Sequence, residues 1–251
     1  MQRIELLSYL DTLLSATRFR DYAPNGLQIE GKAEIKTIVT AVTADQYAIE
    51  QAIALQADCL LVHHGYFWKN EAAVITGMKQ RRIKALLQHD INLIGYHLPL
   101  DAHLEFGNNV QLGRALGLAN IRPLRADNPQ ELIFTGELPT ALDGHQFSTL
   151  IEQTLGRRPL HIAGHQRAIS RVGWCTGGAQ DYIDEAAQFG LDAFISGEVS
   201  ERTYHSSIEQ EIDYFAAGHH ATERGGIRAL GEHLALTHQL IVHFVDTPNP
   251  I

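Results

Sequence analysis

Residues 38–65, IVTAVTADQYAIEQAIALQADCLLVHHG, contain the pattern that decides the fold. An apolar, partly β-branched run at 38–42 precedes a segment whose apolar residues recur at helical spacing, and a second apolar run follows at 59–62. Short apolar runs of Val, Ile and Leu on either side of a helix are typical of buried parallel strands joined by a crossover. This stretch therefore predicts a strand, a helix and a strand of an α/β fold.

The same pattern returns at residues 172–199, VGWCTGGAQDYIDEAAQFGLDAFISGEV. A second pair of segments matches more sharply, NLIGYHLPLD (92–101) and YFAAGHHATE (214–223), since in each an apolar run ends in a histidine that an acid follows four residues later. A pattern of strands and helices that occurs twice predicts layered sheets and helices. We therefore expect two related α/β halves, residues 1–125 and 126–251.

Residues 122–170 interrupt the repeat. They contain four of the eight prolines together with a polar helix candidate at 146–155. We interpret this stretch as an irregular insert of the second half that adds a strand or two. Because no long linker separates the halves, we expect them to pack against each other.

Composition excludes several classes of protein. No apolar run in the 251 residues approaches the roughly 20 that a transmembrane helix needs, and charges interrupt the first residues where a secretory signal would be apolar. Cys59 and Cys175 lie in apolar surroundings and form no metal or redox motif, which fits a reducing compartment, so we expect a cytoplasmic protein without a membrane partner. The net charge of −9 argues against broad nucleic-acid binding.

Polar side chains of one chemical kind follow four of the predicted strands. In open α/β sheets, ligands bind beyond the carboxyl ends of the strands. The chain has 14 histidines, and those at strand ends are joined there by carboxylates. These residues are His63, His64, His97, Asp101, Glu198, His219 and Glu223.

Imidazole and carboxylate are the ligands that borderline divalent metal ions accept. We predict a metal site formed by His63, His64, Asp101, His219 and Glu223. Five such ligands exceed the need of one tetrahedral ion with an open position, and they suit two ions about 3.5–4 Å apart that activate a water molecule. We expect His97 to lie in the second shell or to transfer a proton.

At these residues the sequence resembles the GTP cyclohydrolase I type 2 homologues, also called Nif-three-like proteins, and most closely their short bacterial members. The resemblance extends over nearly the whole chain. The motifs that carry it include DYAPNGLQIEG (21–31), VHHGYFW (62–68), HLPLDAH (97–103), GNN (107–109), WCTGGAQ (174–180), FISGEVSE (194–201) and AAGHHATERGGIRAL (216–230).

The resemblance implies two similar α/β domains, a dinuclear divalent-metal centre between them and a toroidal homohexamer. The metal ligands of the family fall on the five residues predicted above from strand ends. The motifs leave iron, zinc, manganese and nickel open as the ions. The family name implies hydrolytic opening of the guanine imidazole ring of GTP, with loss of formate, by a metal-activated water.

Three functions fit these features. The first is a metal-dependent hydrolase that acts on a nucleotide or a related small molecule. The second is a non-catalytic regulatory or scaffold ring in which protein ligands fill every position of the metals. The third is a ring that handles nucleic acid through its central hole, against which the acidic balance of the chain argues.

Overall fold

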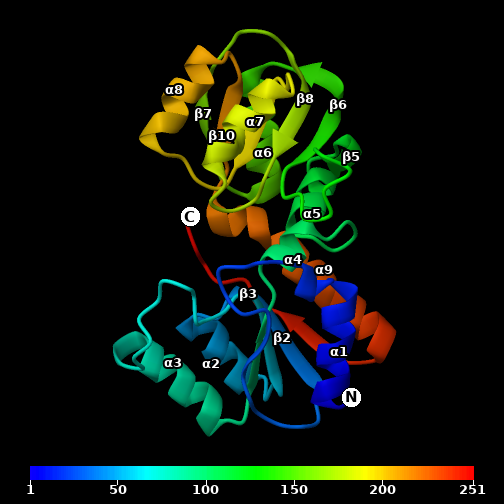
Figure 1. Cartoon of the computed structure of the whole chain (residues 1–251), viewed down its shortest axis with the longest axis vertical. Coiled ribbons are helices and arrows are strands. Elements are labelled where there is room, and N and C mark those ends of the chain that lie inside the picture. Colours follow the sequence, from blue (N-terminus) through cyan, green and yellow to red (C-terminus); the bar gives the residue numbers. More distant parts are fainter. The chain divides into compact units, whose positions relative to one another are not determined.

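The computed structural model describes residues 1–251, which divide into two compact units (Figure 1). Unit 1 contains Met1–Leu100 and Gly226–Pro248, and unit 2 contains Asp101–Gly225 and Asn249–Ile251. The predicted division between residues 125 and 126 follows the repeat in the sequence, whereas these units follow compactness. Each unit contains one sheet, so the predicted α/β class is confirmed.

Unit 1 has a five-stranded sheet in the order β1-β4-β3-β2-β11. Four strands are parallel and the edge strand β1 is antiparallel to β4. The strands are β1 (Gly26–Ile29), β2 (Thr37–Thr43), β3 (Cys59–His64), β4 (Asn92–Gly95) and β11 (Ile241–Phe244). The helices are α1 (Arg3–Leu13), η1 (Ala16–Arg18), α2 (Gln46–Ala54) and α3 (Gly77–Gln88). In Figure 1, α2 and α3 lie on one side of this sheet and α1 lies on the other.

Unit 2 has a six-stranded sheet in the order β5-β6-β8-β9-β10-β7. Its strands are β5 (Ala119–Pro123), β6 (Phe134–Leu142), β7 (Leu160–Ile162), β8 (Ile169–Trp174), β9 (Ala193–Ser196) and β10 (Asp213–Ala216). Its helices are α5 (Asn108–Ala115), α6 (Gly144–Leu155), η2 (Gln180–Tyr182), α7 (Ile183–Gln188) and α8 (Glu201–Glu209). The division into units falls within α4 (Leu98–Ala102) and α9 (His219–His238).

The two sheets contain the same four-stranded core, β1-β4-β3-β2 in unit 1 and β7-β10-β9-β8 in unit 2. In both cores three strands are parallel and the first is antiparallel. The chain order of the elements also matches, because each core strand and helix from α1 to β4 has a counterpart from α6 to β10. The fold therefore contains the predicted repeat. Within residues 122–170, α6 and β7 belong to the repeat, and β6 is the added strand.

An aspartate, buried in unit 1 and half-buried in unit 2, ties the same two strands together in each unit. Asp58 precedes β3, and its Oδ2 accepts hydrogen bonds from two consecutive N–H groups where β2 begins (3.0 and 3.1 Å). Asp192 precedes β9, and its Oδ2 accepts from two consecutive N–H groups at the start of β8 (3.0 and 2.8 Å). Asp58 and Asp192, which occupy equivalent positions in the repeated stretches 38–65 and 172–199, thus have the same structural role.

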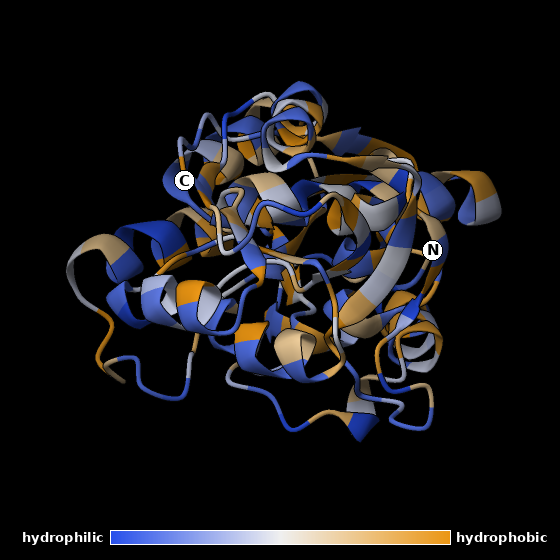
Figure 2. Cartoon of the chain, turned by 90° about the horizontal axis from the view of Figure 1, so that it is seen from above, coloured by the Kyte–Doolittle hydropathy of each residue, from blue (hydrophilic) through white to orange (hydrophobic).

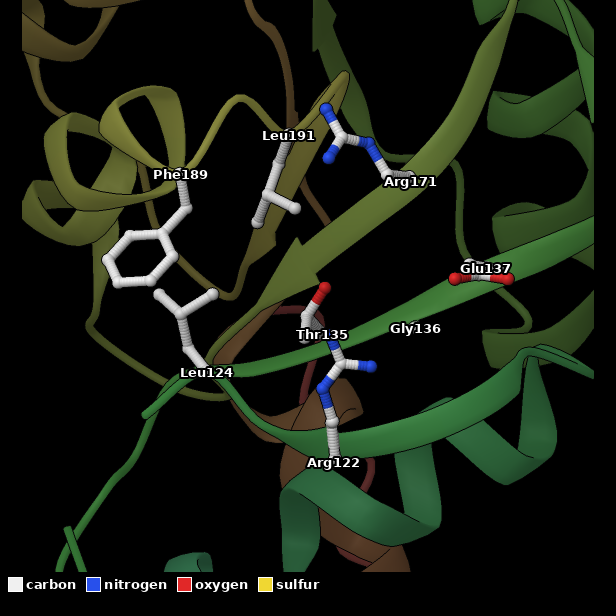
Figure 3. Close-up of a pocket in the computed structure, with 8 residues that line it drawn as sticks. All are labelled: Arg122, Leu124, Thr135, Gly136, Glu137, Arg171, Phe189 and Leu191. Carbon is white, nitrogen blue, oxygen red and sulfur yellow. The ribbon is translucent and has the colours of Figure 1, made fainter. Parts of the chain in front are cut away.

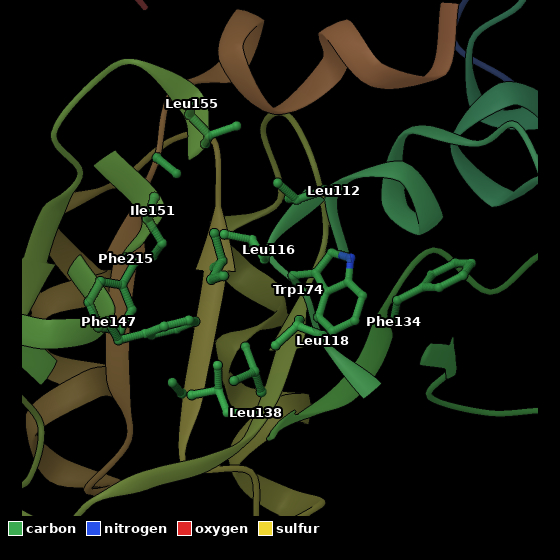
Figure 4. Packing of buried hydrophobic residues seen from close by; sticks show 14 of the residues in the cluster. Leu112, Leu116, Leu118, Phe134, Leu138, Phe147, Ile151, Leu155, Trp174 and Phe215 are labelled. Atoms are coloured by element: carbon green, nitrogen blue, oxygen red, sulfur yellow. The ribbon is translucent and has the colours of Figure 1, made fainter. Parts of the chain in front are cut away.

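Apolar clusters cover both faces of the unit 2 sheet. Phe215 belongs to a cluster with α5 and α6 on one face, whereas its neighbours Tyr214 and Ala216 belong to a cluster with α7 on the other. This alternation is the period of two that a strand imposes. Trp174 is buried in the first cluster, and its Nε1 donates to the carbonyl of Asn109 (2.8 Å; Figure 4).

The helices show both hydrophilic and hydrophobic segments in Figure 2, as expected for helices that bury one face against a sheet. None of them combines the length and the apolar character that crossing a membrane would require.

We predict that Asp58→Ala lowers the free energy of unfolding by about 2 kcal/mol, because it removes the acceptor of two strand N–H groups and of the Lys32 ammonium group. Burial alone would raise the pKa of Asp58, but the hydrogen bonds from Lys32 and the two N–H groups lower it below 3.8. The stabilisation is therefore present above pH 3.8 and is lost as the pH falls through the lower pKa of the folded state.

Urea denaturation at neutral and at acidic pH measures both effects. The control is Asp127→Ala at an exposed position, for which we expect a change within about 0.5 kcal/mol. A destabilisation of the Asp58→Ala protein that stays the same in acid would contradict the role of the ionised carboxylate.

Candidate functional site

Three histidines of unit 1 lie together at the carboxyl ends of neighbouring strands. His63 and His64 end β3, and His97 follows β4. The three offer ligand atoms that all lie within 4.8 Å of one another. His63 is buried, with 1% of its surface exposed, and the other two are half-buried. This group of imidazoles could bind a metal ion, and it includes His97, which we expected from the sequence to support the metal ligands or to transfer a proton.

Two of these rings have a fixed orientation. His63 Nδ1 lies 3.0 Å from the carbonyl oxygen of Tyr96. A carbonyl only accepts hydrogen bonds, so this nitrogen carries the proton and Nε2 has the lone pair. His97 Nδ1 lies 2.7 Å from Oδ1 of Asp21. Both rings therefore hold Nε2 as the nitrogen that can bind metal.

Asp21 is a site residue that the sequence analysis did not identify. Its side chain is 3% exposed, and its Oδ2 accepts from the N–H of Leu98 (2.9 Å). Burial alone would raise the pKa of Asp21, but the hydrogen bond and charge of His97, with further hydrogen bonds, lower it. The carboxylate is therefore ionised and accepts a hydrogen bond from Nδ1–H of His97. The only sequence signal was its place in the motif DYAPNGLQIEG (21–31).

In unit 2, His219 and Glu223 lie one helical turn apart at the start of α9. His219 Nε2 is 3.3 Å from Oε2 of Glu223, whose side chain is 3% exposed. His219 Nδ1 is 2.6 Å from Oε1 of Glu198, which follows β9. Glu198 lies at a strand end that the sequence singled out, but its contact with His219 was not predicted.

The two glutamates change the protonation of His219. Burial alone would lower the pKa of His219, but hydrogen bonds and charges from Glu223 and Glu198 raise it to about 9. A metal ion that binds Nε2 must therefore displace a proton from this ring at neutral pH.

Asp101 is the third predicted ligand in unit 2. It is 6% exposed, and its Oδ1 accepts from Asn108 Nδ2 (2.8 Å) and Thr176 Oγ1 (3.4 Å). Asp101 and Glu223 offer carboxylate oxygens within 4.8 Å of each other. Two buried carboxylates at this distance repel each other when ionised, and a divalent cation between them would relieve that repulsion.

Gly177 makes the close approach of the unit 2 donors sterically feasible. It has a φ of +70°, which residues with a side chain rarely adopt. A Cβ at this position would collide with Oε1 of Glu223 and would lie 3.1 Å from Nε2 of His219. The absence of a side chain at Gly177 therefore leaves room for the side chains of Glu223 and His219, whose atoms could bind metal.

Other histidines have structural partners. His161 Nε2 lies 3.0 Å from Oδ2 of the buried Asp213, and its ring stacks on Phe215. His205 pairs with Glu201 on the exposed surface of α8 (3.0 Å). Both pairs lie outside the groups of possible metal ligands.

A pocket of about 190 Å³ lies elsewhere in unit 2 (Figure 3). Arg122 and Arg171 line it together with apolar side chains that include Phe189 and Leu191. The pocket contains none of the predicted metal ligands. Its volume lies below the roughly 300 Å³ at which ligand pockets begin, so it does not enclose a nucleotide.

The fold and these side chains define a protein of two α/β units with histidine and carboxylate groups suited to a divalent metal ion. Comparison with known proteins agrees with this class. Residues 1–250 match the model of the family described as Duf34/NIF3 (NGG1p interacting factor 3). The chain belongs to this family.

Similar proteins cover the whole chain. A protein of Vibrio cholerae, named GTP cyclohydrolase 1 type 2 homolog, is 55% identical over 100% of both chains. The solved structure of protein ybgI, described as of unknown function, is 51% identical, covers 100% of both chains and has a TM-score of 0.96. The crystal structure of TTHA1606 from Thermus thermophilus is 34% identical with the same coverage and a TM-score of 0.87.

We predict that Gly177→Ala weakens the binding of Zn²⁺ or Mn²⁺, because the added Cβ would displace Glu223 and His219 from their present positions. The matched control is Gly178→Ala, since a Cβ there would meet its nearest atoms, those of Glu198, at 3.5–3.6 Å, which is ordinary contact. Competition with a chromophoric chelator measures the affinity. If both variants bind the ion as tightly as the parent, the steric role of Gly177 is wrong.

Proposed function

We propose that this protein is a metal-dependent hydrolase with a dinuclear divalent-metal centre, formed by His63, His64, Asp101, His219 and Glu223, that acts on a nucleotide or a related small molecule. The observation that supports the proposal is the donor set. Unit 1 contributes clustered imidazoles, and unit 2 contributes an imidazole and two buried carboxylates. Together they exceed what a single ion with an open position uses, and they suit a pair of ions.

The donor types fit borderline divalent ions, so iron, zinc, manganese and nickel are the candidates. Bound as a pair, such ions would lower the pKa of a water molecule and so make it a nucleophile at neutral pH. Asp101 and Glu223 supply the negative charge that offsets the cations. His97, whose Nδ1 donates to Asp21, is the candidate for holding or moving a proton through Nε2.

The substrate class comes from the names of the relatives. Proteins at 51–55% identity are named GTP cyclohydrolase 1 type 2 homolog. GTP is therefore the first substrate to test, and the reaction would be hydrolysis of its guanine ring. Other nucleotides and phosphoesters belong in the same screen, because a shared fold does not establish the reaction.

The proposed centre predicts about two equivalents of metal per subunit. We expect them in protein that is purified without a histidine tag and analysed by elemental mass spectrometry. The double variant His219→Ala, Glu223→Ala should lose metal. The matched control, Glu201→Ala with His205→Ala, removes another Glu–His pair of the same i,i+4 spacing from the exposed face of α8 and should keep the parent content. One equivalent or none, unchanged in the first variant and after metal is added, would contradict the centre.

Catalysis needs a separate test. Protein with a full metal complement should convert GTP or another member of the screen, and removal of metal by a chelator should abolish turnover. Absence of turnover across the screen with both ions bound would exclude the hydrolase and favour the regulatory or scaffold role.

We propose further that the protein is a cytoplasmic homohexamer. The proposed ring rests on the family resemblance, and the compartment is supported by two buried cysteines that form no disulfide. Sedimentation velocity at several concentrations tests the assembly.

A further inference from the structure

The repeat makes His97 and His219 equivalent residues. His97 follows β4 and His219 follows β10, and these two strands occupy the same place in the two sheet cores. Each histidine is followed four residues later by a carboxylate in the helix that begins there, Asp101 in α4 and Glu223 in α9. His97 thus occupies in the first repeat the place that a predicted metal ligand occupies in the second.

Both histidines have the same hydrogen-bonding arrangement. His97 Nδ1 lies 2.7 Å from a carboxylate oxygen of Asp21, and His219 Nδ1 lies 2.6 Å from one of Glu198. In each case Nδ1 donates a hydrogen bond to the carboxylate, so Nε2 is the ring nitrogen that faces the neighbouring possible metal ligands. Nε2 of His219 lies 3.3 Å from Glu223.

The two carboxylates come from different places in the repeat. Asp21 precedes β1, whereas Glu198 follows β9 at the position that His64 occupies in the first repeat. Duplication of one ancestral contact would have produced equivalent partners. Different partners for the same nitrogen instead point to a shared requirement on the imidazole itself.

That requirement is known from metal sites. A carboxylate on Nδ1 fixes the tautomer and the orientation of the ring and makes Nε2 a better ligand. His97 has the surroundings for this role, because its ring centroid lies 5.1 Å from that of His63 and 5.7 Å from that of His64. His161 provides a contrast, because it also pairs with an aspartate, Asp213. Its ring centroid lies 4.3 Å from that of Phe215, on which it stacks, and His161 belongs to none of the groups of possible metal ligands.

We propose that Asp21 and Glu198 are positioning residues that hold the Nε2 atoms of His97 and His219 ready for metal, and that His97 is a metal-facing ligand rather than the proton carrier considered above. The inference rests on the proposed function for the metal. It also makes a claim about the metal-free protein, which is that Asp21 sets the tautomer of His97.

The first experiment reads that tautomer directly. In metal-free protein with ¹⁵N-labelled histidine, two-dimensional NMR should show the proton of His97 on Nδ1. Asp21→Asn should move part or all of it to Nε2. The control is Asp213→Asn, which changes an aspartate of similar burial that also accepts from two backbone N–H groups. This control should leave His97 unchanged, and an unchanged tautomer in Asp21→Asn would overturn the role of Asp21.

The second experiment measures metal affinity by chelator competition with Zn²⁺. We expect Asp21→Asn and Glu198→Gln each to weaken binding about 10- to 100-fold. Glu198 is 44% exposed, so Glu198→Gln should fold even if Asp21→Asn is unstable. The control Glu201→Gln removes the same charge from another Glu–His pair and should bind as the parent does.

The outcomes separate the two proposals. Parent protein that binds two ions, with variants of equal affinity, would overturn the positioning role and leave the proposed function intact. Parent protein that binds no ion would overturn the metal function. In that case the NMR result alone would decide whether Asp21 sets the tautomer of His97.

Discussion

The parallel pairing of β3 with β4 and of β9 with β10 is the constraint on which the rest of the structure depends. Parallel neighbours end at the same edge of a sheet, so residues far apart in the chain meet there. In unit 1 this pairing brings His97 to His63 and His64, and in unit 2 it brings His219 to Glu198. The aspartates before β3 and β9 keep the starts of the strands in place.

The sheet core and most of the donors were predictable from the sequence for the same reason. Apolar runs mark buried strands, and a residue that follows such a run lies at the carboxyl edge of its sheet. This reasoning led to His63, His64 and His97 in one unit and to His219 and Glu223 in the other. The stretch 122–170 was harder to interpret, because its four prolines are typical of irregular structure. The structure shows that α6 and β7, within this stretch, are the counterparts of α1 and β1.

Residues that act through tertiary contacts could not be predicted in this way. Asp21 lies 76 positions from His97, in a segment without strong periodicity, and only folding brings the two together. Gly177 has a role that depends on its backbone angle and on the distance to Glu223, neither of which a pattern of residue types encodes. The contact of Glu198 with His219 needed the orientation of both side chains.

A duplicated scaffold does not require duplicated chemistry. Where the first repeat has His64, the second has Glu198, and that exchange replaces a nitrogen that could bind metal with an acceptor for the neighbouring imidazole. Unit 1 consequently offers neutral donors, whereas unit 2 offers buried negative charge through Asp101 and Glu223. The two donor types are complementary, because neutral imidazoles leave the charge of a divalent ion uncompensated and buried carboxylates repel one another without a cation. The divergence between the repeats thus gives the chain both kinds of donor that the proposed metal centre would use.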